Sequence, residues 1–300
     1  MLRKSTFIFG LLMIAAAALY GDSAIISGKN VKVDAKTLPP GSVTTAVEVY
    51  KTIGTVKLNA FIYFPPYFKP TDKRPCILLF FGGGWNGGDP AKLAPQAQYL
   101  ASRGMVAITP DYRVKTRQGT TPKECVKDGN SAVRWARKNA KRLGIDPARI
   151  VAGGASAGGH VAAATQTALI YDEPAEDLTI SSDPNALVLF NPVYDNGPGP
   201  PPGYGYETVQ AYWRDISPID NIRPIFPPTI VFLGTSDDLI PVATAQKFKQ
   251  LVEAVGGRND LKLYEGREHG FFNSDQPDYL AVLEETDQFL VSIGYLQPKP

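Results

Sequence analysis

Short apolar runs, separated by segments with helical periodicity, dominate the chain from residue 47 onward. Two early runs, 47–53 and 56–64, alternate apolar and polar residues and meet at a short turn containing Gly54, which predicts an antiparallel hairpin. The later runs are short and continuously apolar, as is typical of strands buried on both faces of a parallel sheet. They cover residues 76–81, 105–109, 149–153, 186–190, 229–233 and 261–265.

Helical segments lie between the later runs. In the clearest, residues 122–143, Thr121 can cap the N-terminus, Pro122 suits the first turn and Gly144 can end the helix. The others cover residues 91–103, 157–170, 242–255 and 278–293. A hairpin followed by alternating strands and helices predicts an α/β fold with one eight-stranded, mostly parallel sheet and helices on both faces. We expect one domain over residues 22–300.

The segment 195–224 interrupts this alternation. It is rich in proline and glycine and contains four large aromatic residues, Tyr204, Tyr206, Tyr212 and Trp213. Such a segment is either a surface loop fixed by its aromatic side chains or an insertion on the substrate side of the domain. The sequence leaves both possibilities open.

The N-terminus has the pattern of a secretory signal. Arg3 and Lys4 precede an apolar run at 7–19, which predicts a signal peptide over about residues 1–21 and a secreted or periplasmic protein. The apolar run has 13 residues, whereas a bilayer-spanning helix needs ~20. We therefore expect no stable membrane association once the signal is removed.

Charge and composition narrow the class of partner. Without residues 1–21 the chain has 29 basic and 29 acidic residues, so it lacks the positive field that gathers nucleic acid. Cys76 and Cys125 are expected to be separate buried thiols, although a disulfide between them is not excluded by the sequence. No spacing typical of a metal site or a nucleotide-binding loop is present, so we expect no metal and no cofactor. The oligomeric state is left open.

Ser156 is the candidate nucleophile. It lies in Gly154-Ala155-Ser156-Ala157-Gly158, directly after a buried run and before an alanine-rich helix. A sharp turn from strand to helix forces the serine into strained backbone geometry, so its neighbours must be small. The start of the helix then favours the negative charge that develops on the hydroxyl oxygen.

The nucleophile needs a base, and the base needs an acid. The chain has two histidines: His160 lies one turn into the helix after Ser156 and is expected to be structural, whereas His269 follows the last strand and is the candidate base. In this fold the acid lies between serine and histidine in the chain. Asp237 and Asp238 follow the strand at 229–233, and we prefer Asp237.

A glycine loop at 82–84 follows the third strand and is the candidate oxyanion hole. Glycines let backbone N–H groups approach a substrate oxygen closely. We expect the donors to be Gly83 and Gly84, together with the amide of Ala157. Trp85 and Tyr112 are candidates for lining the substrate cleft.

Four motifs in this order resemble a known family. A Gly-Gly-Gly-Trp loop at 82–85, Gly-Ala-Ser-Ala-Gly-Gly-His at 154–160, Gly-Thr-x-Asp-x-x-x-Pro at 234–241 and His-Gly-Phe at 269–271 are similar to the α/β-hydrolase esterases related to hormone-sensitive lipase. The likeness is closer to bacterial exported esterases of the feruloyl and acetyl-xylan type. It implies a catalytic triad of Ser156, Asp237 and His269.

One position departs from that family pattern. Phe81 stands where the family usually has a histidine that braces the glycine loop, so packing must hold the loop here. The helical N-terminal cap of many relatives also has no counterpart, which implies an open cleft suited to an ester on a polymer.

The sequence thus predicts a serine carboxylesterase without cofactors, acting on short acyl esters. The resemblance suggests acetyl or feruloyl groups on plant polysaccharides. Two alternatives are a lipase or an amide or formamide hydrolase with the same triad, and an inactive hydrolase fold used as a binding module.

Overall fold

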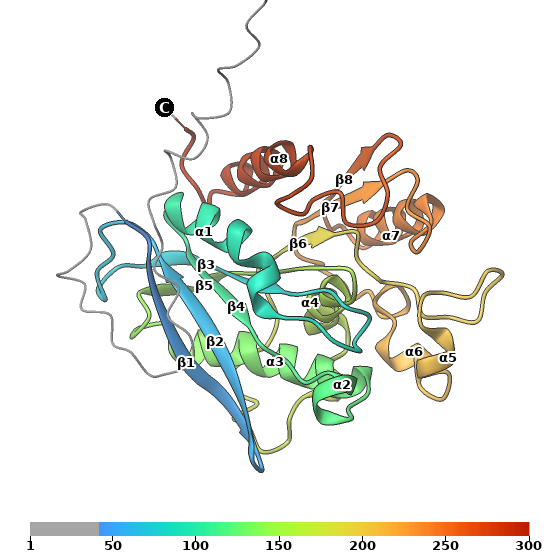
Figure 1. Ribbon diagram of the computed structural model, residues 1–300, viewed down its shortest axis with the longest axis horizontal. Coiled ribbons are helices and arrows are strands. Elements are labelled where there is room, and N and C mark those ends of the chain that lie inside the picture. Colours follow the sequence, from blue (N-terminus) through green and yellow to red (C-terminus); the bar gives the residue numbers. More distant parts are fainter. Residues whose placement is uncertain (1–41, 300) are drawn as a thin grey trace, which may run out of the picture.

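The strands of the computed structural model, which describes residues 42–299, form one sheet of eight strands (Figure 1). Their order is β1-β2-β4-β3-β5-β6-β7-β8. β1 and β2 form an antiparallel hairpin, β2 also pairs antiparallel with β4, and every later pairing is parallel. The prediction of an eight-stranded, mostly parallel sheet is confirmed. The strands are β1 (Thr44–Ile53), β2 (Val56–Phe64), β3 (Arg74–Phe80), β4 (Val106–Pro110), β5 (Ile145–Ala155), β6 (Ala186–Phe190), β7 (Thr229–Gly234) and β8 (Asn259–Tyr264).

Helices cover both faces of this sheet (Figure 1). Side chains of α3, α4 and α7 join the core cluster on one face, and those of α1 and α8 join the cluster on the other. The long helices are α1 (Ala94–Ser102), α3 (Pro122–Lys138), α4 (Ala157–Thr167), α7 (Val242–Ala254) and α8 (Tyr279–Ser292). The short ones are α2 (Lys115–Gln118), α5 (Tyr206–Val209), α6 (Trp213–Ile216) and the 3₁₀ turns at Pro90–Leu93, Leu169–Tyr171 and Pro218–Asp220.

The central strands show why the later apolar runs are continuous. In β3, Cys76, Leu78 and Phe80 belong to the cluster under α3 and α4, whereas Ile77 and Leu79 belong to the cluster under α1 and α8. Successive strand residues point to opposite faces, and both faces are covered, so every position must be apolar.

The predicted helices are present with small changes at their ends. The largest change is in α3, which ends at Lys138 instead of 143. The chain then tightens into turns in which Ala140 N–H donates to Arg137 O (3.2 Å) and Arg142 N–H to Asn139 O (3.0 Å), and Gly144 has φ 58°. The N-terminus of α3 is capped as predicted, through reciprocal bonds between Thr121 and Glu124.

The segment 195–224 combines the two roles that the sequence left open. Its second half, with α5 and α6, packs Val209 and Ile216 against Val126 of α3 and Ala164 of α4. Its first half holds Tyr204, which lines the pocket that contains Ser156. The segment is therefore anchored through its helices and reaches the pocket through its first ten residues.

Both cysteines are buried and free, which confirms the expectation of separate thiols. Burial raises the pKa of the Cys76 thiol and that of the Cys125 thiol, so both stay in the protonated, unreactive form. The predicted signal segment, residues 1–21, lies outside the described residues. Within 42–299, no helix has the length and apolar character needed to cross a bilayer.

Candidate active site

Ser156 stands on the sharp turn between β5 and α4. Its backbone has φ 54° and ψ −121°, a left-handed conformation that costs energy in a residue with a side chain. Ser156 N–H donates to Phe190 O (3.0 Å), and its carbonyl accepts from His160 N (3.0 Å) and Val193 N (3.2 Å). These bonds hold the strained residue with its side chain toward the pocket.

Close backbone contacts explain the small residues around Ser156. A Cβ added to Gly154 would lie 2.4 Å from Gly158 O, and one added to Gly158 would lie 2.1 Å from Phe80 O. Real Cβ atoms do not approach carbonyl oxygens this closely, so any larger residue would force the turn open. The two glycines of the serine motif are therefore needed for strand, turn and helix to pack against β3.

His269 and Asp237 form a hydrogen-bonded pair after β8 and β7. Nδ1 of His269 lies 2.8 Å from Oδ2 of Asp237, and the Asp237 side chain is fully buried whereas that of His269 is 21% exposed. The other carboxylate oxygen, Oδ1, accepts from the N–H groups of Leu239 and Ile240, each at 2.9 Å. Asp238 is exposed, and Nδ1 of His269 is paired with Asp237, so the geometry favours the acid preferred from sequence.

Asn191, which the sequence analysis did not single out, holds the opposite side of the His269 ring. It is fully buried directly after β6 with φ 32°, and its Nδ2 lies 3.2 Å from Nε2 of His269. Its Oδ1 accepts from Gly270 N–H at 3.0 Å. Its position at the carboxyl end of a buried strand, where sites in such sheets are built, is the signal that could have identified it.

Asn191 also fixes which ring nitrogen of His269 carries the proton. Since Gly270 N–H must meet the amide oxygen, the amide NH₂ is the group that faces Nε2. An NH₂ group can only donate, so Nε2 must supply a lone pair and Nδ1 must carry the proton that points to Asp237. This is the tautomer that a general base for a serine requires. Among residues 42–299, Nε2 bonds to Asn191, and no hydrogen bond joins it to the Ser156 hydroxyl.

The glycine loop lies beside Ser156 with its N–H groups available. Among the described residues, the N–H groups of Gly83, Gly84 and Ala157 donate no hydrogen bond. Gly83 has φ 138°, and a Cβ there would lie 2.2 Å from Gly87 O, so only glycine fits. Gly83 and Gly84 line the same pocket as Ser156, and Ala157 is the next residue in the chain after Ser156.

The expectation that Trp85 and Tyr112 line the cleft is corrected by the structure. Tyr112 is fully buried, stacks on Phe81 with ring centroids 4.0 Å apart and donates its hydroxyl to Phe81 O at 2.6 Å. Trp85 is 3% exposed and packs against His160 and Tyr204. Both aromatic residues support the ends of the glycine loop without lining the pocket. The loop needs this support because it has no side chains that could pack.

His160 has the structural role expected for it. It is fully buried in α4, and its Nε2 lies 3.0 Å from Ile216 O. Burial lowers the pKa of His160 to about 4, so the ring is neutral at physiological pH. It cannot reach the pocket and joins α4 to the segment 195–224.

The candidate residues surround one pocket with a volume of about 350 Å³. Ser156, His269 and the glycines 82–84 line it, together with Tyr204 of the segment 195–224 and Leu239, two residues after Asp237. This volume is within the range of small-ligand pockets, about 300–1,000 Å³. A hydroxyl on a strained turn, next to a base held in the required tautomer, is what nucleophilic attack on a carbonyl needs. Together with the doubly wound sheet beneath, it defines a serine hydrolase with the α/β-hydrolase fold.

Comparison with known proteins identifies the family. A family model described as BD-FAE matches residues 61–183, and a model of the Dienelactone hydrolase family matches residues 204–289. Esterase LipC of Mycobacterium tuberculosis is 29% identical over 221 residues, which cover 67% of this chain and 54% of LipC. The chain spans about half the length of the curated relatives it matches.

Solved structures of Thermogutta terrifontis esterase 2 are more similar. The form described as phosphorylated by paraoxon is 44% identical, covers 85% of this chain and 96% of that one, and superposes with a TM-score of 0.80. The propionate-bound and butyrate-bound forms are 42% identical, cover 87% of this chain and 97% of theirs, and also give 0.80. The chain belongs to the α/β-hydrolase esterases related to hormone-sensitive lipase, a family of carboxylic ester hydrolases.

Proposed function

We propose that this protein is a serine carboxylesterase that hydrolyses short-chain acyl esters through an acyl-enzyme on Ser156. The observation that carries the proposal is the shared pocket: a strained serine, a histidine held in the base tautomer and an unpaired set of backbone donors line or adjoin one hollow. Each of these features has a role in acyl transfer and no evident role in packing alone.

In the acylation step, the Ser156 oxygen forms a bond to the ester carbonyl carbon and its proton passes to Nε2 of His269. Before this transfer, Nε2 must exchange its contact with Asn191 for the serine hydroxyl, in line with the tightening of catalytic hydrogen bonds that commonly accompanies substrate binding. Asp237 stabilises the imidazolium that forms. The imidazolium returns the proton to the leaving alcohol as the carbon–oxygen ester bond breaks.

The carbonyl oxygen becomes an oxyanion during this step. The free N–H groups of Gly83, Gly84 and Ala157 are the proposed donors to it. Each such donor typically contributes about 10²–10³-fold in turnover. Water activated by His269 then attacks the acyl-enzyme, releases the acid and restores Ser156.

Short acyl groups are favoured by two observations. The pocket of about 350 Å³ is small, and relatives of high similarity are described as propionate-bound and butyrate-bound. Within this class, acetyl or feruloyl groups on plant polysaccharides are the proposed natural esters, supported by the BD-FAE match and by the signal-like N-terminus. Export of the protein to the periplasm or the medium belongs to the same proposal.

Initial rates on p-nitrophenyl acetate, butyrate and octanoate test the proposal. We expect the wild type to hydrolyse acetate or butyrate fastest and octanoate much more slowly. Ser156→Ala should reduce these rates by about 10⁴-fold or more, because the nucleophile is lost. Ser102→Ala, an exposed serine at the end of α1, is the matched control and should leave them unchanged.

A second readout separates an esterase from an inactive hydrolase fold. A fluorophosphonate should label the wild type on Ser156 with one-to-one stoichiometry and leave Ser156→Ala unlabelled. Absence of labelling, together with equal rates for wild type and Ser156→Ala, would contradict the assignment.

A further inference from the structure

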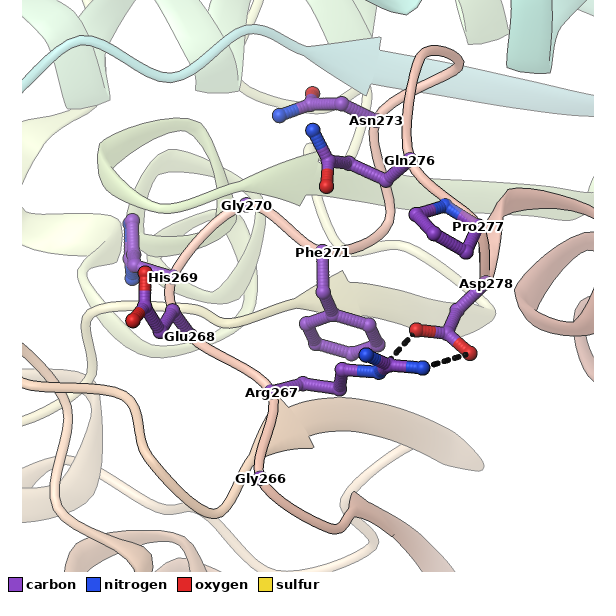
Figure 2. A pocket seen from close by; sticks show the side chains of 10 residues that line it. All are labelled: Gly266, Arg267, Glu268, His269, Gly270, Phe271, Asn273, Gln276, Pro277 and Asp278. Atoms are coloured by element: carbon purple, nitrogen blue, oxygen red, sulfur yellow. Dashed lines mark hydrogen bonds and ion pairs between the residues drawn. The ribbon is translucent and has the colours of Figure 1, made fainter.

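A second hollow adjoins the catalytic pocket at His269. It has a volume of about 330 Å³ and is lined by one continuous segment, residues 266–278 (Figure 2). His269, Gly270 and Asn273 line both hollows, whereas Ser156 and the glycine loop line only the catalytic pocket. The two hollows therefore meet at the candidate base.

The segment that forms the second hollow is internally braced. Arg267 and Asp278 form an ion pair across it, with Nε and Oδ2 2.5 Å apart (Figure 2). Backbone bonds from Asn273 N to Gly270 O (3.0 Å) and from Gln276 N to Asn273 O (2.9 Å) close its turns. Because these bonds fix the backbone, the hollow exists before any ligand arrives.

Three polar side chains that line this hollow are available to bind a ligand. Glu268, Asn273 and Gln276 make no side-chain hydrogen bond or ion pair with another described residue. Figure 2 shows Asn273 and Gln276 close to each other, Glu268 beside His269, and the Phe271 ring next to the side chain of Arg267. A ligand that displaces water here must replace the hydrogen bonds of these groups, so an alkyl chain would be disfavoured.

The chemistry of the proposed reaction decides which part of an ester reaches the second hollow. His269 gives its proton to the leaving alcohol, so the alcohol must lie against the imidazole. The acyl carbonyl must lie at Ser156 and the glycine loop, which are in the catalytic pocket alone. A hollow that contains His269 without Ser156 is thus on the alcohol side.

We propose that this hollow is a leaving-group subsite for a neutral, polyhydroxylated alcohol, namely a single sugar ring. This inference rests on the proposed esterase function. Hydroxyl groups of a sugar can pair with the carboxylate and the two amides, and the exposed ring of Pro277 adds apolar surface for its C–H groups. Arg267 is neutralised by Asp278, so Glu268 leaves the hollow with a net negative charge that repels anionic alcohols.

Two esters that share an acyl group test the subsite. Methyl 6-O-butyrylglucoside and cyclohexylmethyl butyrate yield the same butyryl-enzyme, so the ratio of their kcat/KM values reports only recognition of the alcohol. We expect the wild type to prefer the sugar ester by about tenfold or more, since two or three hydrogen bonds are available to it alone.

Substitutions in the hollow should remove this preference. Glu268→Ala combined with Gln276→Ala should lower the ratio of sugar to cyclohexyl ester about tenfold, and each single change should give an intermediate value. Gln246→Ala, an exposed glutamine of α7 that lines neither hollow, is the matched control and should leave the ratio unchanged. Using a ratio cancels any general loss of activity in a variant.

The outcomes separate the subsite from the esterase function itself. A wild-type ratio near one, an unchanged ratio in the double variant, or a preference for the butyryl ester of a glucuronic acid derivative would overturn the subsite and leave the esterase intact. Failure to hydrolyse any of these esters or p-nitrophenyl butyrate would instead overturn the proposed function.

Discussion

At the scale of single residues, the contacts of Asn191 show how a buried amide can set the state of a catalytic base. Both ends of the amide are committed: Oδ1 accepts from Gly270 N–H, and Nδ2 donates to Nε2 of His269. The residue has φ 32°, which asparagine tolerates better than most side chains. Its backbone and side chain thus both help to position the loop that carries His269 and Gly270.

Asn191→Asp should impair the base while keeping the shape of the site. A carboxylate can still accept from Gly270 N–H, but the oxygen facing Nε2 now favours a proton on that nitrogen. A carboxylate so close commonly moves a titration by one to three pH units. We therefore expect the acidic limb of the kcat/KM profile to move to higher pH by about that amount, with lower activity at pH 7.

Asn191→Gly is the control for this charge effect. Glycine accepts the positive φ at no cost and removes both hydrogen bonds without adding a charge. Its kcat/KM should fall, while its acidic limb should move much less than that of Asn191→Asp, because only the donated hydrogen bond to Nε2 is lost. Coincident pH profiles for the two variants would show that Asn191 does not act on the protonation of His269.

At the scale of elements, a buried ion cluster joins β1, the loop after β4 and α3. Asp128 of α3 has a fully buried side chain, with Lys51 Nζ 2.8 Å from one oxygen and Arg113 Nε 2.8 Å from the other. Arg113 also donates its backbone N–H to Asp128 at 3.0 Å. Because Tyr112 precedes Arg113 and holds Phe81, this cluster fixes the support behind the glycine loop.

Asp128→Asn should lower the free energy of unfolding by about 3–5 kcal/mol, because it leaves the buried Arg113 without its counter-charge and Lys51 with Glu173 as its remaining anionic partner. Urea denaturation followed by circular dichroism measures this. Glu48→Gln removes the partner of Arg142 in a pair that is 33% and 52% exposed, and it should cost less than about 1 kcal/mol. Equal losses in the two variants would mean that the buried cluster is not a structural centre.

The helices and strands differ in how well the sequence predicts them. Strands such as β6, with five consecutive buried apolar residues, carry their own signal in the apolar run. The sequence predicts the end of α3 five residues too late, since its periodicity continues into a turn whose bonds are not visible in the sequence. The prediction that Trp85 and Tyr112 line the cleft is wrong, because the sequence does not indicate whether an aromatic residue near a glycine loop faces substrate or packs behind the loop.

At the scale of the whole molecule, the parallel sheet explains why the site residues could be predicted although they are distant in sequence. β5, β6, β7 and β8 run in parallel, so the residues that follow them, Ser156, Asn191, Asp237 and His269, emerge at one edge. For Ser156, Asp237 and His269, the residue type itself indicates the role of nucleophile, acid or base. Asn191 has the same position directly after a buried strand, but its contacts with His269 and Gly270, like the hollow at 266–278, depend on side-chain geometry that no spacing in the chain encodes.

The buried histidine of α4 gives the fold as a whole a predictable response to acid. An unfolded histidine has a pKa near 6.5, whereas burial lowers that of His160 to about 4. Between these values the unfolded chain binds a proton that the folded chain does not, so stability falls as the pH falls through this window. At about 1.4 kcal/mol per pKa unit, His160 accounts for a loss of about 3 kcal/mol.

His160→Gln isolates this contribution, because its side chain cannot be protonated and its NH₂ can still donate to Ile216 O. The variant should be less stable than the wild type at pH 7, where repacking against Trp85 costs energy. As the pH is lowered from 7 to 4.5, the stability of the wild type should fall more steeply, and the gap between the two should narrow by about 2–3 kcal/mol. Urea titrations at several pH values measure the gap, and carboxylates shared by both proteins cancel in the difference. A gap that stays constant across this range would show that His160 is not held neutral by the fold.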